Sequence, residues 1–229
     1  MRLDKFIGHA RDLSRVQIHV LIKRGAVSVN SIIAQKGAQQ VSESDVITLN
    51  GEPVLLAKNR YLMLHKPIGY VCANSDSEHP TVLDLIDEPN KQNLQIAGRL
   101  DVDTTGLVLI TDDGQWNHRV TAPKSQCKKT YRVTTVAPIA ADTLALFAAG
   151  IQLHGEKKPT EPAQLVLIDE HTAQVTISEG KYHQVKRMFA ASGNRVVALH
   201  RESIGEILLD PALPQGKYRA LTQTEIEAI

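Results

Sequence analysis

The sequence has few cysteines and no long hydrophobic run. Its 229 residues include two cysteines, Cys72 and Cys127, which lie outside any CxxC or Cys/His metal-binding spacing. No apolar stretch approaches the roughly 20 residues that cross a bilayer. The charged start MRLDKFIGHA lacks the apolar segment of a secretory signal. The sequence therefore predicts neither a membrane span nor a disulfide framework, and two free thiols suit the reducing cytoplasm.

The charge of the chain is unevenly distributed. The first 40 residues carry seven basic side chains against Asp4 and Asp12, a net charge of about +5. Because the whole chain carries +1, the remainder carries about −4. This asymmetry predicts a small basic module that binds a polyanion, attached to a mildly acidic body. A charged face that is merely solvated remains the alternative.

The first 57 residues read as a separate small domain. Helical spacing of apolar residues predicts helices over 3–10 and 15–24, the second capped by Ser14 and ended by Gly25. We expect Val16, Val20 and Leu21 to share one face of that second helix. The segments 26–30 and 44–51 read as strands, the later one ending in an Asn-Gly turn.

Residues 58–229 read as a larger α+β domain. Strand patterns outnumber helix patterns and do not alternate regularly with them, which predicts a mostly antiparallel, mixed sheet. We expect Asp142, Gly193 and Thr222 to cap helices. The strands are expected within 60–66, 70–73, 94–101, 106–111, 128–137, 163–170, 173–180 and 195–209, and the helices within 81–89, 141–150, 181–194 and 221–229.

The segment IAGRLDVDTTGLVLITDDG, Ile96 to Gly114, holds four aspartates among apolar and Gly/Thr residues. Three chemistries could use Asp101. A calcium loop would need a bidentate glutamate at its twelfth position, where the chain has Asp112. An aspartyl-phosphate phosphatase would need a hydrophobic strand directly before the loop, Mg²⁺ and a parallel doubly wound sheet. The third chemistry is attack of a carboxylate on a sugar-linked base.

The segment Lys181 to Arg201 is basic and contains no Asp or Glu. Helical spacing places Val185, Met188 and Phe189 on a core face and leaves Lys186 and Arg187 to point elsewhere. A basic side chain beside Asp101 would keep that carboxylate ionised, and an ionised, desolvated carboxylate is a competent nucleophile. A structural salt bridge is the alternative.

These motifs resemble those of bacterial ribosomal pseudouridine synthases. AGRLDVDTTGLVLITDDG is similar to their G-R-L-D-x-x-[ST]-x-G signature, KTYRV to their K-x-Y motif, and EGKYHQVKRMF to their third motif. The start of the chain resembles the S4 RNA-binding domain, and RYLMLHKPIGYVC and TDDGQWNHRVTAP resemble the small-subunit (16S) rRNA subfamily. Two positions depart from the pattern: Ser31 where S4 domains often have Gly, and Lys186 where many relatives have Arg, which loses bidentate geometry.

The resemblance implies that a uridine of 16S rRNA, uridine 516, is flipped out and isomerised to pseudouridine. It implies a catalytic role for Asp101 as nucleophile, for Tyr131 stacked on uracil and for Lys186 as the cation that holds Asp101 ionised. Asp103 is expected to fix the loop by accepting backbone N–H groups. The implied RNA-binding residues are Arg99, Arg187, His183, Gln184, Arg2, Lys5, Arg15, Lys23 and Arg24.

The isomerisation loses no group and changes no redox state, so the resemblance implies neither a cofactor nor a metal. The expected partner is rRNA in a partially assembled small subunit, with no membrane partner, and the expected form is a cytoplasmic monomer. A synthase for 23S rRNA and a non-catalytic RNA-binding protein of the S4 type are the alternatives.

Overall fold

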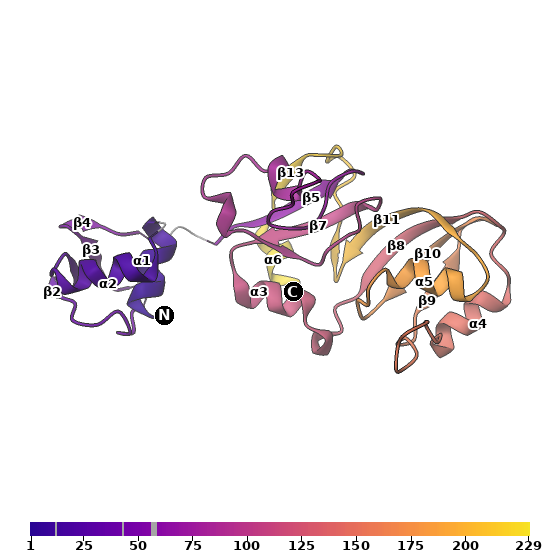
Figure 1. Ribbon diagram of the computed structural model, residues 1–229, viewed down its shortest axis with the longest axis horizontal. Helices are drawn as coiled ribbons and strands as arrows, with labels where there is room; N and C mark the ends of the chain where they lie inside the picture. The colour runs from indigo at the N-terminus through magenta and orange to yellow at the C-terminus, as the bar shows by residue number, and fades with distance from the viewer. Residues whose placement is uncertain (12, 43, 56–58) are drawn as a thin grey trace. The chain divides into compact units, whose positions relative to one another are not determined.

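The computed structural model describes residues 1–11, 13–42, 44–55 and 59–229, which form two compact units, Met1–Asn59 and Arg60–Ile229 (Figure 1). The boundary expected between residues 57 and 58 falls within 56–58, outside the described residues. Each unit has its own hydrophobic core, so each is described by itself.

The first unit packs two helices against a small antiparallel sheet. Its elements are α1 (Leu3–Arg11), α2 (Arg15–Lys23), β1 (Val27–Val29), β2 (Ile32–Ile33), β3 (Ile47–Leu49) and β4 (Glu52–Pro53), with the strand order β2-β1-β3-β4. Ser14 caps α2 through a reciprocal capping box with Gln17, as its position before the helix predicts. The core face of α2 carries Ile18 and Ile22.

The face of α2 that carries Val16 and Val20 is not the face that packs on the core. Val16 is 75% exposed and Val20 is 41% exposed, so both lie away from the core, while Leu21 packs partly against it. Two apolar stripes compete on this short helix, and the one containing Ile18 and Ile22 is buried.

The turn between β1 and β2 places two non-glycine residues in the left-handed region. Asn30 has φ 50° and Ser31 has φ 68°. Asparagine tolerates this conformation, but serine is strained in it. Ser31 is therefore a point of backbone strain in the first unit.

The second unit is built on one large mixed sheet. Its helices are η1 (Val82–Leu85), η2 (Lys91–Asn93), α3 (Gly114–Thr121), η3 (Pro123–Ser125), α4 (Asp142–Ala149), α5 (Gln184–Ala191) and α6 (Gln223–Glu227), where η marks a 3₁₀ helix. Its strands are β5 (Tyr61–Lys66), β6 (Gln95–Ala97), β7 (Thr105–Thr111), β8 (Lys129–Thr135), β9 (Gln164–Leu167), β10 (Thr172–Ile177), β11 (Val196–Ile204), β12 (Ile207–Leu208) and β13 (Tyr218–Ala220).

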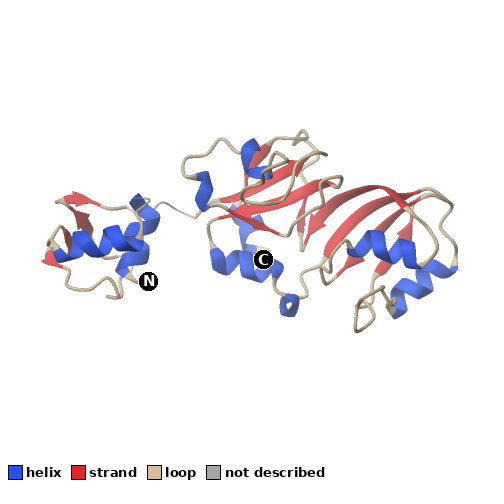
Figure 2. Cartoon of the chain, viewed as in Figure 1, coloured by secondary structure: helices blue, strands red, loops and turns tan. Residues whose placement is uncertain are grey.

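The strand order in this sheet is β13-β5-β7-β11-β8-β10-β9, with β6 paired to β7 and β12 to β11. Neighbours run antiparallel except for β7 and β11, which run parallel. The fold is therefore α+β with a mostly antiparallel sheet, as the pattern of strands and helices predicted. Figure 2 shows this sheet in red with helices packed against it.

Strand β7 lies inside the sheet, between β5 and β11, and is covered on both faces. Its residues alternate between two cores: Val108 and Ile110 join the cluster that includes residues of α4 and α5, whereas Leu107 and Leu109 join the cluster formed with α3 and the residues around α6. Successive residues of the strand point to opposite faces, and both faces are buried, so the strand reads as a continuous apolar run.

Several predicted elements differ in the structure. The strand expected within 70–73 is reduced to a single bridge between Val71 and Thr81, and residues 82–85 form a 3₁₀ helix. Asp142 is the first residue of α4 rather than its cap, because Ala141 occupies the cap position. Helix α3 was not anticipated, although Asp113 caps it by accepting hydrogen bonds from the backbone of Gln115 and Trp116.

Two alternatives for the aspartate segment fail on this fold. Residues 105–111 form strand β7, so the segment from Asp101 to Asp112 cannot wrap as a twelve-residue calcium loop. Asp112 pairs with Arg60 instead. The phosphatase alternative requires a parallel doubly wound sheet, which the antiparallel neighbours of β7 exclude. No helix of the described residues is long and apolar enough to span a membrane.

Candidate active site

Asp101 lies in the loop that connects β6 to β7, and a quarter of its side chain is exposed. The loop leaves β6 through Gly98, whose φ of +89° favours glycine. A turn then closes when the amide of Thr104 donates to the Asp101 carbonyl at 3.1 Å. Asp101 is thus held next to the central strand while its carboxylate stays accessible.

Lys186, on helix α5, reaches this loop. Its Nζ lies 2.9 Å from Asp101 Oδ2 and 2.6 Å from Asp103 Oδ1. Burial alone would lower the pKa of Lys186, but hydrogen bonds to Asp103 and Asp101 outweigh burial and raise it. The hydrogen bond from Lys186 also lowers the pKa of the Asp103 carboxyl group. The lysine therefore stays charged at neutral pH.

His183 contacts the other oxygen of Asp101. Its Nε2 lies 3.3 Å from Asp101 Oδ1, and its ring stacks on Tyr182 with centroids 3.7 Å apart. His183 has φ 46°, so helix α5 begins only at Gln184, later than expected. Because both oxygens of Asp101 face a nitrogen of α5 or its cap, the orientation of the carboxylate is fixed from that side.

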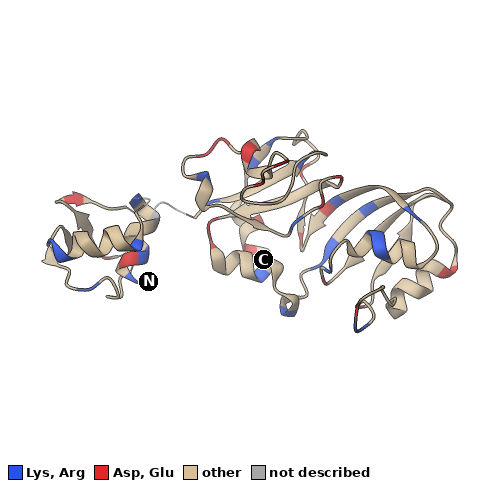
Figure 3. Cartoon of the chain, in the orientation of Figure 1, with Lys and Arg blue, Asp and Glu red and all other residues tan. Residues whose placement is uncertain are grey.

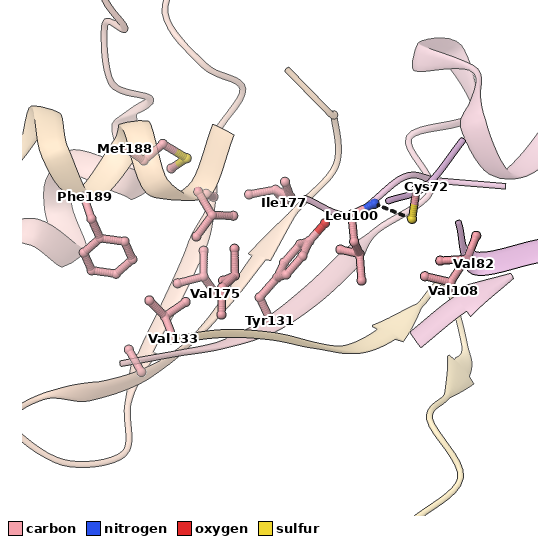
Figure 4. Packing of buried hydrophobic residues seen from close by; sticks show 14 of the residues in the cluster. Cys72, Val82, Leu100, Val108, Tyr131, Val133, Val175, Ile177, Met188 and Phe189 are labelled. Carbon is pink, nitrogen blue, oxygen red and sulfur yellow. Dashed lines mark hydrogen bonds between the residues drawn. The ribbon is translucent and has the colours of Figure 1, made fainter. Parts of the chain in front are cut away.

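Tyr131 comes from strand β8 and is 8% exposed. Figure 4 shows its ring in the hydrophobic cluster, where Leu100 and Ile177 are also packed. The amide of Leu100 donates to Cys72 Sγ at 3.3 Å in the same region (Figure 4). Tyr131 therefore packs against the residue that directly precedes Asp101.

Arg201, on β11, is 1% exposed and binds the backbone on both sides of Asp101. Its Nη2 donates to the Gly98 carbonyl at 2.6 Å, its Nη1 to the Arg99 carbonyl at 3.3 Å, and its Nε to the Leu107 carbonyl at 2.8 Å. The same Nη1 lies 3.4 Å from the Tyr131 hydroxyl. One guanidinium thus links the Asp101 loop to Tyr131.

The close packing of Arg201 depends on Gly106, its parallel partner on β7. A Cβ atom at Gly106 would lie 2.3 Å from the Arg201 carbonyl oxygen, and the φ of Gly106 is +110°. A side chain at this position would push β11 away from β7, and with it the guanidinium from the loop.

Lys66 holds the other end of the loop. Its side chain is fully buried at the end of β5, and its Nζ donates to the carbonyls of Pro67 at 2.9 Å, Val102 at 3.3 Å and Thr104 at 2.8 Å. Burial lowers its pKa. Sequence reasoning assigned no role to Lys66 or Arg201, although each is a charge inside an apolar strand pattern, which is the signal that could have found them.

The predicted RNA-binding residues of the second unit have different environments. Arg99 is exposed, and within the described part of the chain its guanidinium has no partner. Arg187 lies beside the site, but its guanidinium pairs with Glu156 and donates to the carbonyls of His154 and Tyr182. Gln184 is buried and donates to Glu179, so it does not face solvent.

The predicted residues of the first unit lie on its surface. Arg2 pairs with Asp4. The remaining four are exposed and, among the described residues, form no ion pair: Lys5, Arg15, Lys23 and Arg24. They remain available to an anionic partner.

A family model for RNA pseudouridylate synthases matches residues 60–191, more than half of the chain. The chain belongs to this family. It is 52% identical to ribosomal small subunit pseudouridine synthase A of Vibrio cholerae, over 100% of this chain and 99% of that protein. It is 51% identical to the Escherichia coli K12 protein of the same name, over the full length of both. A solved structure described as a pseudouridylate synthase superposes with a TM-score of 0.73 at 51% identity, covering 100% of this chain and 99% of that one.

Proposed function

We propose that the chain isomerises a uridine of 16S rRNA to pseudouridine, with Asp101 as the nucleophile. The observation that carries the proposal is the partly exposed Asp101 carboxylate, 2.9 Å from Lys186, in a chain about half identical to synthases named for the small ribosomal subunit. An ionised carboxylate on a rigid loop, open to solvent on one side, is what attack on a nucleoside requires.

The chemistry balances without a co-reactant. The target uridine leaves the stack so that its sugar meets Asp101. Asp101 attacks C1′ or assists the departure of uracil, the N1–C1′ bond breaks, and uracil leaves with the electron pair. The base then rotates and C5 bonds to C1′, which breaks any bond formed between Asp101 and C1′ and returns the free carboxylate. The C5 proton is lost, and N1 takes up a proton. No atom is gained or lost, so the reaction calls for no cofactor.

The neighbours of Asp101 take separate roles in this scheme. Lys186 pairs with Oδ2 and orients it, and its contact at 2.9 Å is shorter than the 3.3 Å contact between His183 and Oδ1. We assign the attack to Oδ1, the less tightly held oxygen. Tyr131 lies under the uracil, and the exposed guanidinium of Arg99 binds the phosphate beside the flipped nucleotide.

The first unit is an S4-like RNA-binding module in this proposal. Its exposed cations grip phosphates, which position the RNA but do not select the base. The target is uridine 516, recognised in partially assembled small subunits, and the protein acts as a monomer in the cytoplasm. The net charge of about +5 in the first 40 residues supports the RNA-binding role of the first unit.

The test is release of tritium from 16S rRNA labelled at uridine C5, naked and in partially assembled subunits, with mapping of the modified position. We expect release by the native chain and a loss of at least about a thousandfold in Asp101→Asn. Asp103→Asn is the matched control, because it removes a carboxylate from the same lysine. It should keep at least about a tenth of the activity.

The other outcomes separate the alternatives. Release from 23S rRNA alone would reassign the substrate to the large subunit. If neither RNA releases tritium but both still bind, the chain is an RNA-binding protein without catalytic activity. Full activity in Asp101→Asn would remove Asp101 from the mechanism.

A further inference from the structure

A groove of about 700 Å³ opens beside the active site and follows helix α5. Asp103, His183 and Lys186 line it near Asp101, and Asn194 and Arg195 line it beyond the end of the helix. Positions 183, 186, 187 and 190 all line it, and this spacing puts them on one helical face. The groove is therefore continuous with the site where the target nucleotide must be bound.

The two walls of the groove beyond α5 are joined by hydrogen bonds. The amide of Val136 donates to the Arg195 carbonyl at 2.9 Å, and the amide of Ala137 donates to Asn194 Oδ1 at 3.2 Å. Asn194 Nδ2 returns hydrogen bonds to the carbonyls of Ala137 and Pro138 at 2.9 and 3.3 Å. These contacts tie the segment after β8 to the turn before β11, so the groove is formed before any ligand binds.

Cations dominate the lining. Lys186, Arg187 and Arg195 face it, with His183, against the single carboxylate of Asp103. Lys186 and Arg187 already have internal partners. Arg195 is exposed, and its guanidinium has no partner anywhere in the described residues. The far end of the groove thus carries a cation that is free to bind an anion. The basic residues of α5 appear in blue in Figure 3.

The rest of the lining is apolar and partly open to solvent. Val136 is 49% exposed, and Ala190 on α5 is also exposed. An apolar surface beside a free cation, along a narrow path, suits the faces of unpaired bases and the adjoining phosphate. From Lys186 to Ala191, the last residue of α5, the chain advances about 7.5 Å along the helix axis. The groove continues past the end of the helix to Arg195, which leaves room for a short single strand.

We propose that this groove binds the single-stranded RNA that flanks the target uridine on one side. Arg195 binds a phosphate of that strand, and Val136 and Ala190 contact its bases. The proposal rests on the function proposed above and adds the path of the RNA away from Asp101. Single-stranded RNA is favoured over a duplex because the strand continues from a nucleotide that has been flipped out of its stack.

The first experiment blocks the groove with a large side chain. Val136→Trp fills the exposed wall, and Val166→Trp on β9 is the matched control, because Val166 is 47% exposed and lies outside the groove. We expect Val136→Trp to raise the Kd for 16S rRNA at least about tenfold and Val166→Trp to leave that Kd unchanged. Equal affinities of the two variants, with equal melting temperatures, would overturn the proposal.

The second experiment removes the free cation. Arg195→Ala should weaken binding of 16S rRNA several-fold at 0.15 M salt and lower the slope of log K against log salt by about 0.7, the value for one phosphate of a single strand. Lys124→Ala, which removes an exposed lysine outside the groove, is the control.

A native Kd and salt slope in Arg195→Ala would show that no phosphate binds there. Because Kd and the salt slope measure binding, they test whether the groove binds RNA even if the native chain releases no tritium from any rRNA. An absence of tritium release would contradict the proposed function but not RNA binding in the groove.

Discussion

The two units of this chain use basic side chains in opposite ways. In the first unit, Lys23 and Arg24 stand exposed at the end of α2, where water solvates them and an incoming polyanion can replace that water. In the second unit, Lys66 and Arg201 are almost fully buried, and backbone carbonyls replace the lost water. The comparison teaches that exposure decides what a cation can contact: an exposed one is available to a partner, and a buried one holds a loop.

The buried cations share an unusual choice of partner. Each donates to three carbonyls of the main chain and has no carboxylate within hydrogen-bonding distance among the described residues. A carboxylate would compete with the Asp101 loop for the donors. Four of the six accepting carbonyls belong to that loop: those of Gly98, Arg99, Val102 and Thr104. The two cations therefore fix the backbone on both sides of Asp101.

The largest expected effect tests this contrast directly. Lys66→Met keeps the length of the side chain but removes a buried donor from three carbonyls, of which that of Val102 keeps another partner, the Gly69 amide at 2.9 Å. We therefore expect the free energy of unfolding of the second unit to fall by about 3 kcal/mol. Lys23→Met removes an exposed lysine and should change the stability of the first unit by less than about 0.5 kcal/mol. Denaturant unfolding of both variants measures the difference, and similar losses would remove the distinction between the two kinds of cation.

Binding should show the reverse order. The double variant Lys23→Ala, Arg24→Ala is expected to weaken 16S rRNA binding about tenfold at 0.15 M salt, because two phosphate contacts are lost. The salt slope should fall by roughly 1.5 to 2 units. Filter binding over a salt series checks this, with Lys36→Ala as the exposed control in the same unit. Unchanged binding would exclude the end of α2 from the RNA interface.

An ion pair in the second unit sharpens the comparison with an intermediate case. The Arg219 guanidinium donates to both oxygens of Glu225, at 2.9 and 2.8 Å, and lowers the pKa of Glu225 to about 2. A carboxyl group with a depressed pKa stabilises the fold above its unfolded pKa of about 4.5 and loses that contribution as the pH falls through about 2.

Glu225→Gln should therefore lower stability by about 1 kcal/mol at pH 7, after allowance for screening by solvent. The difference from the native chain should shrink below pH 4.5 and vanish near pH 2. Thermal unfolding at pH 7, 4 and 2.5 gives the profile. A difference that does not depend on pH would mean that the charge on Glu225 contributes nothing.

The smallest expected effect concerns the backbone of the first unit. Ser31→Gly relieves a left-handed serine with φ 68°, and we expect a gain of roughly 0.5 to 1 kcal/mol after the larger chain entropy of glycine is subtracted. Ser44, which is not in the left-handed region, supplies the control: Ser44→Gly should stabilise nothing. If both substitutions destabilise the unit equally, Ser31 is not strained.

The parts of the fold that local patterns determine were predictable. Helices α2 and α6 have their caps at Ser14 and Thr222 as expected, and β7 and β8 follow from their apolar residues. The segment around Asp101 and the basic helix α5 could each be recognised, because their residue types are unusual for a core. That Lys186 reaches Asp101 follows from the resemblance and not from either segment alone.

What sequence reasoning missed depends on contacts between distant segments. The role of Lys66 exists only because residues 102–104 return to the end of β5, and that of Arg201 only because β11 lies parallel to β7 at Gly106. Helix α3 was missed because its eight residues bury little more than Trp116 and Val120. Gln184 was expected to face the substrate, but the late start of α5 turns it inward.

The clamp that Lys66 and Arg201 place on the Asp101 loop also has an electrostatic consequence. The Arg201 guanidinium and the Lys66 side chain, neither bonded to a carboxylate in the described structure, lie against the loop in surroundings that screen charge poorly. Their electric field acts on Asp101 and Asp103 and on any negative charge that develops above the loop. If uracil leaves C1′ with an electron pair, this field would stabilise its negative charge. The charged groups are already in place, so they would not have to reorient during the reaction.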